Sequence, residues 1–243
     1  MSMIRFFGKT DVGLVRQNNE DIFLFDQDRG FCLVADGMGG MAGGERASRF
    51  FAQAANENLS SGRHTSEADQ IDAVQRTFWH ANQSILNYVD ENPHLKGMGC
   101  TAELLVFSKN RFVIGHMGDS RTYQFRNNRL KQLTKDHSLV QEQLDQGLIS
   151  VPQAEIHSMR NIILRAVGVE TDLQLDIIRG NIRQGDQYLL CSDGLTDMVD
   201  SNAMADVLAT GAGLHQKVEK LISKALSAGG NDNITVVLSM VSE

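Results

Sequence analysis

An α+β fold is predicted from the order of helical and strand-like segments in this chain of 243 residues. Strand-like runs come before, between and after the helical segments, so the regular alternation of a parallel α/β fold is missing. Several of the runs are paired across short turns, and such hairpins imply antiparallel sheet. No repeat, low-complexity tract or linker divides the sequence, and we expect a single domain over residues 1–243.

The first half begins with short strands and continues with two helices. Residues 22–25 are strand-like, and residues 31–35 form a continuous apolar run of the length that suits a buried strand. Apolar side chains then recur at three- and four-residue intervals over residues 47–54, which predicts a helix. A longer helix is expected over about residues 66–92, with Pro93 just beyond its end.

The second half returns to strands before two final helices and a last strand. Residues 102–107 and 111–117 flank a turn-prone tripeptide and predict a hairpin. Residues 121–125 and 130–133, on either side of Asn127-Asn128, predict another. The remaining expected elements are helices at 136–147, 201–209 and 214–228, and strands at 173–178, 188–191 and 234–240.

Charge and composition argue against two classes of partner. The net charge of -7 disfavours nucleic-acid binding, which needs clustered Lys and Arg, and disfavours docking on an anionic membrane. No apolar stretch is long enough to span a bilayer, and the first residues lack the apolar core of a signal peptide. Cys32, Cys100 and Cys191 show no paired spacing, which fits a reducing compartment. We therefore expect a cytoplasmic protein without nucleic acid or membrane insertion.

Two of the most apolar runs of the chain lead into an Asp-Gly pair, namely Asp36-Gly37 and Asp193-Gly194. A sheet holds an aspartate rigidly at the end of a strand, and the following glycine allows a turn and can expose its carbonyl. If the two ends meet, two carboxylates share one cavity and require cations between them. The alternative is that each pair only forms a turn, and the two strand ends alone leave both interpretations open.

Further acidic residues stand in turn contexts beside expected strands. They are Glu20, Asp21, Asp119 and Asp232. Oxygen ligands of this kind suit Mg²⁺ or Mn²⁺ rather than Zn²⁺. The histidines show no metal-ligand spacing, and His116 and His137 are expected to be structural. The glycine-rich segment that follows Asp36 lacks the Lys-Ser/Thr of a phosphate-binding P-loop, so metal binding is the stronger interpretation.

A series of motifs in this order resembles the type 2C (PPM) family of metal-dependent protein serine/threonine phosphatases, particularly its compact bacterial members. The motifs lie at residues 15–21, 35–40, 97–101, 118–121, 133–140, 161–168, 191–197 and 230–235. The resemblance implies a four-layer α-β-β-α sandwich, with two central antiparallel sheets flanked by helices. The polar segment near residues 149–160 then corresponds to the family's flap, at about 147–162, which borders the active site.

The resemblance also implies a metal ligand set. Asp36 would bridge two tightly bound Mn²⁺ or Mg²⁺ ions, with the Gly37 carbonyl on one of them. Asp193 and Asp232 would complete the first ion. Asp119, together with Asp193, matches a weaker third site of the bacterial members.

Four more residues are placed by the resemblance. Glu20 and Asp21 would hold waters that are bound to the metals, rather than contact the metals themselves. Arg16 would bind the substrate phosphate, because a planar guanidinium pairs two phosphate oxygens at once. Met38 stands where animal members carry a histidine that is proposed as the general acid. Methionine has no proton to donate, so the general acid is not assigned.

The implied reaction is attack of a metal-activated water on a phosphoserine or phosphothreonine ester. The expected partners are phosphorylated Ser/Thr proteins, including a bacterial-type kinase and its substrates, and the expected state is a monomer. Two alternatives remain: an inactive binding module with the same fold, and a hydrolase of small phosphoesters. Every expected metal carboxylate is present, which favours an active enzyme over a binding module.

Overall fold

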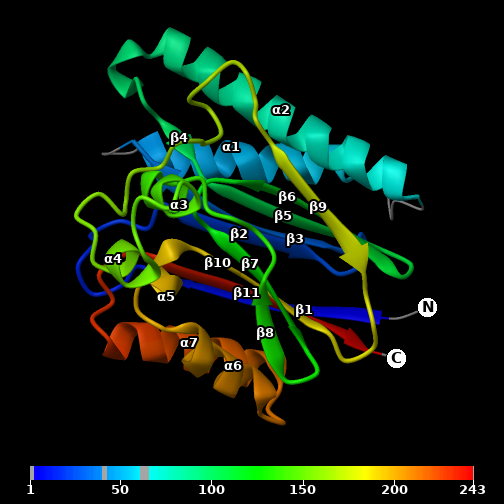
Figure 1. Cartoon of the computed structure of the whole chain (residues 1–243). Coiled ribbons are helices and arrows are strands. Elements are labelled where there is room, and N and C mark those ends of the chain that lie inside the picture. The colour runs from blue at the N-terminus through cyan, green and yellow to red at the C-terminus, as the bar shows by residue number, and fades with distance from the viewer. Residues whose placement is uncertain (1–2, 40–42, 61–65, 243) are drawn as a thin grey trace.

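The computed structural model describes residues 3–39, 43–60 and 66–242. Two β-sheets face each other between two pairs of helices (Figure 1). The helices on one side are α1 (Gly43–Asn58) and α2 (Glu67–Glu91), and those on the other are α6 (Ser201–Ala209) and α7 (Leu214–Ser227). This arrangement confirms the predicted four-layer α-β-β-α sandwich.

The first sheet, sheet A, contains both terminal strands of the fold. Its order is β1-β11-β10-β7-β8, and all neighbouring strands are antiparallel. The strands are β1 (Met3–Asp11), β7 (Arg121–Arg126), β8 (Arg129–Gln132), β10 (Gln187–Cys191) and β11 (Ile234–Ser242). The sequence analysis did not predict β1. Most of this edge strand is only partly buried, so it lacks the continuous apolar run of β10.

The second sheet, sheet B, has the order β2-β3-β5-β6-β9, with the short β4 paired to β3. The strands are β2 (Asp21–Asp26), β3 (Phe31–Met38), β4 (Gly99–Cys100), β5 (Ala102–Ser108), β6 (Arg111–Met117) and β9 (Asp176–Asn181). Both predicted hairpins form, as β5-β6 and β7-β8. Asn127 and Asn128 adopt φ of 51° and 58° in the second turn, the left-handed geometry that suits a two-residue hairpin loop.

Three apolar clusters fill the spaces between the layers. One lies between sheet B and helices α1 and α2, where the rings of Phe51 and Phe78 meet edge to face at 4.8 Å. One lies between the sheets, around the fully buried Tyr188. The third lies between sheet A and helices α6 and α7. Each sheet is therefore buried on both faces, and the ends of the strands are left to carry polar groups.

Helix α2 agrees with its predicted range of 66–92 because both ends carry clear signals. Ser66 caps the first turn by accepting a hydrogen bond from the Asp69 amide at 3.1 Å, and the Asp69 carboxylate accepts from the Ser66 amide. This reciprocal capping box satisfies two amides that a helix start otherwise leaves unpaired. The helix ends at Glu91, and the short 3₁₀ helix η1 (Pro93–Leu95) follows.

Two local expectations need correction. Strand β3 does not end before Asp36-Gly37 but continues through it to Met38, and Asp193 opens the short helix α5 (Asp193–Thr196) rather than a simple turn. Neither Gly37 nor Gly194 has a positive φ. Both glycines are needed for close packing, because a Cβ on Gly37 would lie 2.1 Å from a backbone oxygen of α1.

The predicted flap at 147–162 holds the short helix α4 (Val151–Glu155), and another short helix, α3 (Leu139–Asp145), precedes it. Helix α3 is shorter than the predicted 136–147, and β9 begins three residues later than expected. Gly40, part of the glycine-rich motif, lies outside the described residues. Among the described residues, no helix is both long enough and apolar enough to cross a membrane.

Replacing Phe78 by alanine should lower the free energy of unfolding by about 3–5 kcal/mol, because it removes a fully buried ring from the contact between α1 and α2. Trp79, the next residue on the same helix, is 61% exposed and provides the control. Its replacement by alanine should change the stability by only about 0.5 kcal/mol. Urea unfolding of both variants measures the difference, and equal losses would contradict the packing described here.

Candidate active site

Carboxylates from both sheets gather at one end of the sandwich. The pairing of β2 with β3 places Asp21 directly opposite Asp36 in sheet B. In sheet A, Asp193 follows β10 and Asp232 precedes β11, and these two strands are neighbours. Asp119 lies in the connection from β6 to β7, where the chain passes from sheet B to sheet A. The backbone thus brings together the five aspartates that the sequence analysis singled out.

A hydroxyl group joins the two sheets at this end. Ser192 lies at the end of β10 and donates from its Oγ to Asp21 Oδ2 at 2.8 Å. The same oxygen accepts from the Thr235 amide at 3.0 Å, so Ser192 also bonds to β11. The sequence analysis missed this role, because a serine between an apolar run and an aspartate carries no distinctive signal.

The electrostatics of the cluster are those of crowded buried acids. Burial is the largest cause that raises the pKa of Asp36 and of Asp193 well above the ordinary value, and neighbouring aspartates add to it. Burial likewise raises the pKa of Asp21 and of Asp119 to about 6. The Oδ1 atoms of Asp21, Asp119 and Asp193 are buried without a hydrogen-bond partner. Buried carboxylate oxygens without hydrogen-bond partners would be stabilised by a bound cation.

The donor set fits a hard divalent cation. Its atoms are carboxylate oxygens with no cysteine or histidine among them, which is the chemistry that Mg²⁺ and Mn²⁺ prefer. Over residues 3–39, 43–60 and 66–242, no three acidic, histidine or cysteine side chains are arranged closely enough to hold a metal ion as they stand. Both oxygens of Asp232 are engaged, one with Arg16 at 2.7 Å and one with the Asn233 amide at 2.8 Å. Asp232 would become a ligand for a cation if it gave up its contact with Arg16.

Arg16 lies on the exposed loop between β1 and β2, with its guanidinium over the carboxylates. Its Nη2 pairs with Asp232, and Asp193 and Asp36 also help to raise its pKa. The side chain is 57% exposed, so it can reach a ligand that enters from solvent. The structure thus brings the predicted phosphate-binding residue to the predicted metal site.

Asn233 holds the loop that carries Arg16. Its Nδ2 donates to the carbonyls of Val12 at 3.0 Å and Asn18 at 2.9 Å, and its Oδ1 accepts from the Glu20 amide at 2.8 Å. Glu20 itself is half-buried, and burial is the main cause that raises its pKa. Asn233 is a second residue that the sequence analysis left without a role.

A cavity of about 590 Å³ opens beside the cluster. Asp119 and Asp193 line it, together with Val151, Ala154 and Arg160 of the flap region. Arg160 also pairs with Asp197 of the segment after α5 at 3.1 Å. The predicted flap therefore borders the acidic site in the structure and contributes one wall of a space that a substrate could enter.

An antiparallel sandwich with an all-oxygen carboxylate site at the ends of its strands fits a metal-dependent enzyme, and a known family matches this chain. The family model Protein phosphatase 2C matches residues 13–228. The chain is 39% identical over 234 residues to the serine/threonine phosphatase stp of Listeria welshimeri, covering 95% of this chain and 93% of the relative. It therefore belongs to the protein phosphatase 2C family, and the predicted family and enzyme class are confirmed.

Solved structures agree with this assignment. The crystal structure of the Mycobacterium tuberculosis phosphatase PstP/Ppp matches with a TM-score of 0.93 at 34% identity, covering 99% of this chain and all of that one. A structure of the PstP catalytic domain in complex with two manganese ions matches with a TM-score of 0.91 at 34% identity, covering 100% of both chains. The roles of individual site residues in this chain stay predictions.

In the absence of metal, we expect the protein to lose stability as the pH rises from 3.8 through about 6. The raised pKa values of Asp21 and Asp119 mean that the folded state binds more protons than the unfolded state over that window. Thermal unfolding in EDTA measures this, and Asp36→Asn should unfold at a higher temperature than the parent at neutral pH.

Asp206→Asn provides the control for this experiment, because Asp206 is exposed on α6. It should unfold like the parent at every pH. Saturating Mn²⁺ should raise the unfolding temperature of the parent and the control more than that of Asp36→Asn. Stability that increases with pH in EDTA would contradict the description of the site as crowded acids.

Proposed function

We propose that this protein is a Mn²⁺- or Mg²⁺-dependent serine/threonine protein phosphatase whose active site is the cluster around Asp36 and Asp193. The observation that carries the proposal is the set of buried carboxylates from two sheets, whose pKa values are raised and whose oxygens lack partners. The names of the relatives, which are serine/threonine phosphatases, support the same activity.

Two ions would be held by Asp36, the Gly37 carbonyl, Asp193 and Asp232, with Asp36 between them. Asp119 and Asp193 would hold a weaker third ion. Glu20 and Asp21 would not contact the ions directly but would hold water molecules that do. Support for Asp21 in this outer role comes from its hydrogen bond to Ser192, which already occupies one of its oxygens.

When bound, the ions supply a water of lowered pKa as the nucleophile and neutralise charge on the phosphoryl oxygens. Arg16 binds the phosphate in a bidentate manner once it is released from Asp232, and its charge stabilises the equatorial oxygens of the transition state. Asn233 keeps the Arg16 loop in place. Met38, half-buried at the end of β3, has no proton to give to the leaving group.

The proposed substrates are proteins phosphorylated on serine or threonine, among them a kinase of bacterial type and its targets. We place the enzyme in the cytoplasm as a monomer. The three buried free cysteines, Cys32, Cys100 and Cys191, support a reducing compartment. The net charge of -7 disfavours nucleic acid as a partner.

Release of phosphate from a phosphothreonine peptide should require added Mn²⁺ and should stop in EDTA. Asp193→Asn should lower the turnover by about 100-fold or more, because it removes a charged ligand from the proposed ions. Asp206→Asn on α6 should retain the parent rate. A folded parent protein that releases no phosphate with any divalent ion would instead favour the binding-module alternative.

Arg16→Ala should raise the KM for a phosphopeptide more than it lowers kcat, because the guanidinium contacts the bound phosphate before the reaction begins. Steady-state kinetics with saturating Mn²⁺ measure both constants. Arg29→Ala, at a surface arginine that pairs with Asp26, is the matched control and should change neither constant. Loss of kcat alone in Arg16→Ala would point to a role confined to the transition state.

A further inference from the structure

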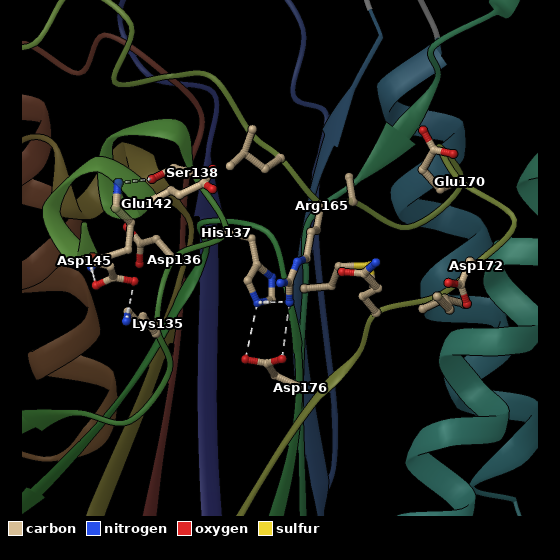
Figure 2. Close-up of a pocket in the computed structure, with 16 residues that line it drawn as sticks. Lys135, Asp136, His137, Ser138, Glu142, Asp145, Arg165, Glu170, Asp172 and Asp176 are labelled. Carbon is tan, nitrogen blue, oxygen red and sulfur yellow. Dashed lines mark hydrogen bonds and ion pairs between the residues drawn. The ribbon is translucent and has the colours of Figure 1, made fainter. Parts of the chain in front are cut away.

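His137 lies in a wall that separates two cavities. The cavity of about 590 Å³ beside the acidic cluster and a second one of about 460 Å³ share Asp136, Ser138 and Gln141 as lining residues. Figure 2 shows the second cavity, with the ring of His137 inside it beside Arg165 and above the carboxylate of Asp176. The ring is buried, and no step of the proposed reaction uses it.

Both backbone polar groups of Gly118 bond to His137. The Gly118 amide donates to His137 Nδ1 at 3.1 Å, and the Gly118 carbonyl accepts from the His137 amide at 2.7 Å. Gly118 is buried with a φ of +110°, and a Cβ there would lie 2.5 Å from the side chain of Thr101. The two peptide groups on either side of the Gly118 Cα, which precede Asp119, are therefore held by different parts of His137. The ring holds the Met117–Gly118 peptide and the backbone amide holds the Gly118–Asp119 peptide, while Thr101 packs against Gly118 itself.

These hydrogen bonds determine the protonation of the His137 ring. An amide can only donate, so Nδ1 must be the unprotonated acceptor, and the proton of the neutral ring is on Nε2. Asp176 Oδ2 lies 3.3 Å from Nε2 and accepts from it. Arg165 Nη1, 3.4 Å from the same nitrogen, cannot donate to it and pairs with Asp176 Oδ1 at 3.5 Å (Figure 2).

Burial, aided by the neighbouring His116, keeps the His137 ring neutral. His116 lies with its ring centre 4.5 Å from that of His137, donates from Nε2 to the Lys135 carbonyl, and contacts the buried Glu103 through Nδ1. Burial lowers the pKa of His116, but Glu103 more than compensates and raises it to about 8. Burial, followed by the charge of His116, lowers the pKa of His137 to about 4.

Asp119 is the next residue after Gly118. Its carboxylate is buried, has an oxygen without a partner, and is the neighbour that contributes most to the raised pKa of Asp193. If the His137 ring is removed, the buried Gly118 amide loses its acceptor, and the Met117–Gly118 peptide, one residue before Asp119, can rotate to find another. Such a rotation would turn Asp119 away from Asp193.

We propose that His137 is a positioning residue that acts through the Gly118 amide to hold the Asp119 carboxylate against Asp193. The ring does not reach the substrate, and Asp176 serves it by keeping the proton on Nε2. The inference rests on the proposed function, since it assigns the Asp119–Asp193 pair to the weakest of the three cation sites. The part of His137 that matters is therefore the acceptor at Nδ1 rather than a charge.

Two amide substitutions at His137 test the roles of the two ring nitrogens separately. His137→Asn places a carbonyl oxygen where Nδ1 stood and keeps an acceptor for Gly118. His137→Gln places its amide near the former Nε2, so the contact with Asp176 is kept and the acceptor for Gly118 is lost. Electron paramagnetic resonance measures the concentration of free Mn²⁺ in the presence of the full chain, which gives the amount bound. Thermal unfolding in EDTA measures the stability of each variant.

His137→Gln should weaken the lowest-affinity Mn²⁺ site by about 10-fold or more and leave the tighter sites unchanged, as expected when an outer-shell partner is lost. His137→Asn should restore that affinity to near the parent value. The inference is overturned if both variants bind Mn²⁺ like the parent, or if both lower the unfolding temperature while their binding curves coincide. A parent protein that binds Mn²⁺ but releases no phosphate refutes the proposed function without altering this comparison.

Discussion

The repulsion among buried carboxylates at one end of the sandwich is the constraint on which the rest of the structure depends. Asp36 and Asp193 come from different sheets. Burial raises the pKa of each, and their acidic neighbours raise it further. The carboxylates repel one another, so they stay close together only because the backbone fixes their positions. The two sheets supply that rigidity, since both are buried on both faces and neither can shift without disrupting an apolar layer.

A small number of polar contacts transmits this rigidity to the site. Ser192 joins sheet A to Asp21 of sheet B, Asn233 fixes the loop that carries Arg16, and His137 accepts a hydrogen bond from the amide of Gly118, the residue before Asp119. Each contact involves a backbone group or a carboxylate whose position would otherwise be free. The acidic cluster, the loop and the flap are thus parts of one assembly, in which cation binding would relieve the charge that the fold has concentrated.

The sequence predicted the fold class, both hairpins and all five aspartates of the cluster, because each of these leaves a local pattern of periodicity or turn chemistry. It did not predict β1, whose pairing with β11 depends on residues at the far end of the chain. It also missed Ser192 and Asn233, and it gave His137 only a structural role. These residues act through hydrogen bonds across the fold, and nothing in their neighbours along the sequence indicates such partners.

The central claim is that the cluster is a site for two or more divalent cations. Anomalous diffraction from crystals grown with Mn²⁺ tests it most directly, because the scattering identifies the metal and places it independently of any assumed ligand. The account predicts two strong peaks that share Asp36, one of them in contact with Asp193 and Asp232, and Arg16 released from Asp232. Well-ordered crystals with no anomalous peak among these aspartates, at Mn²⁺ concentrations that support phosphate release, would contradict it.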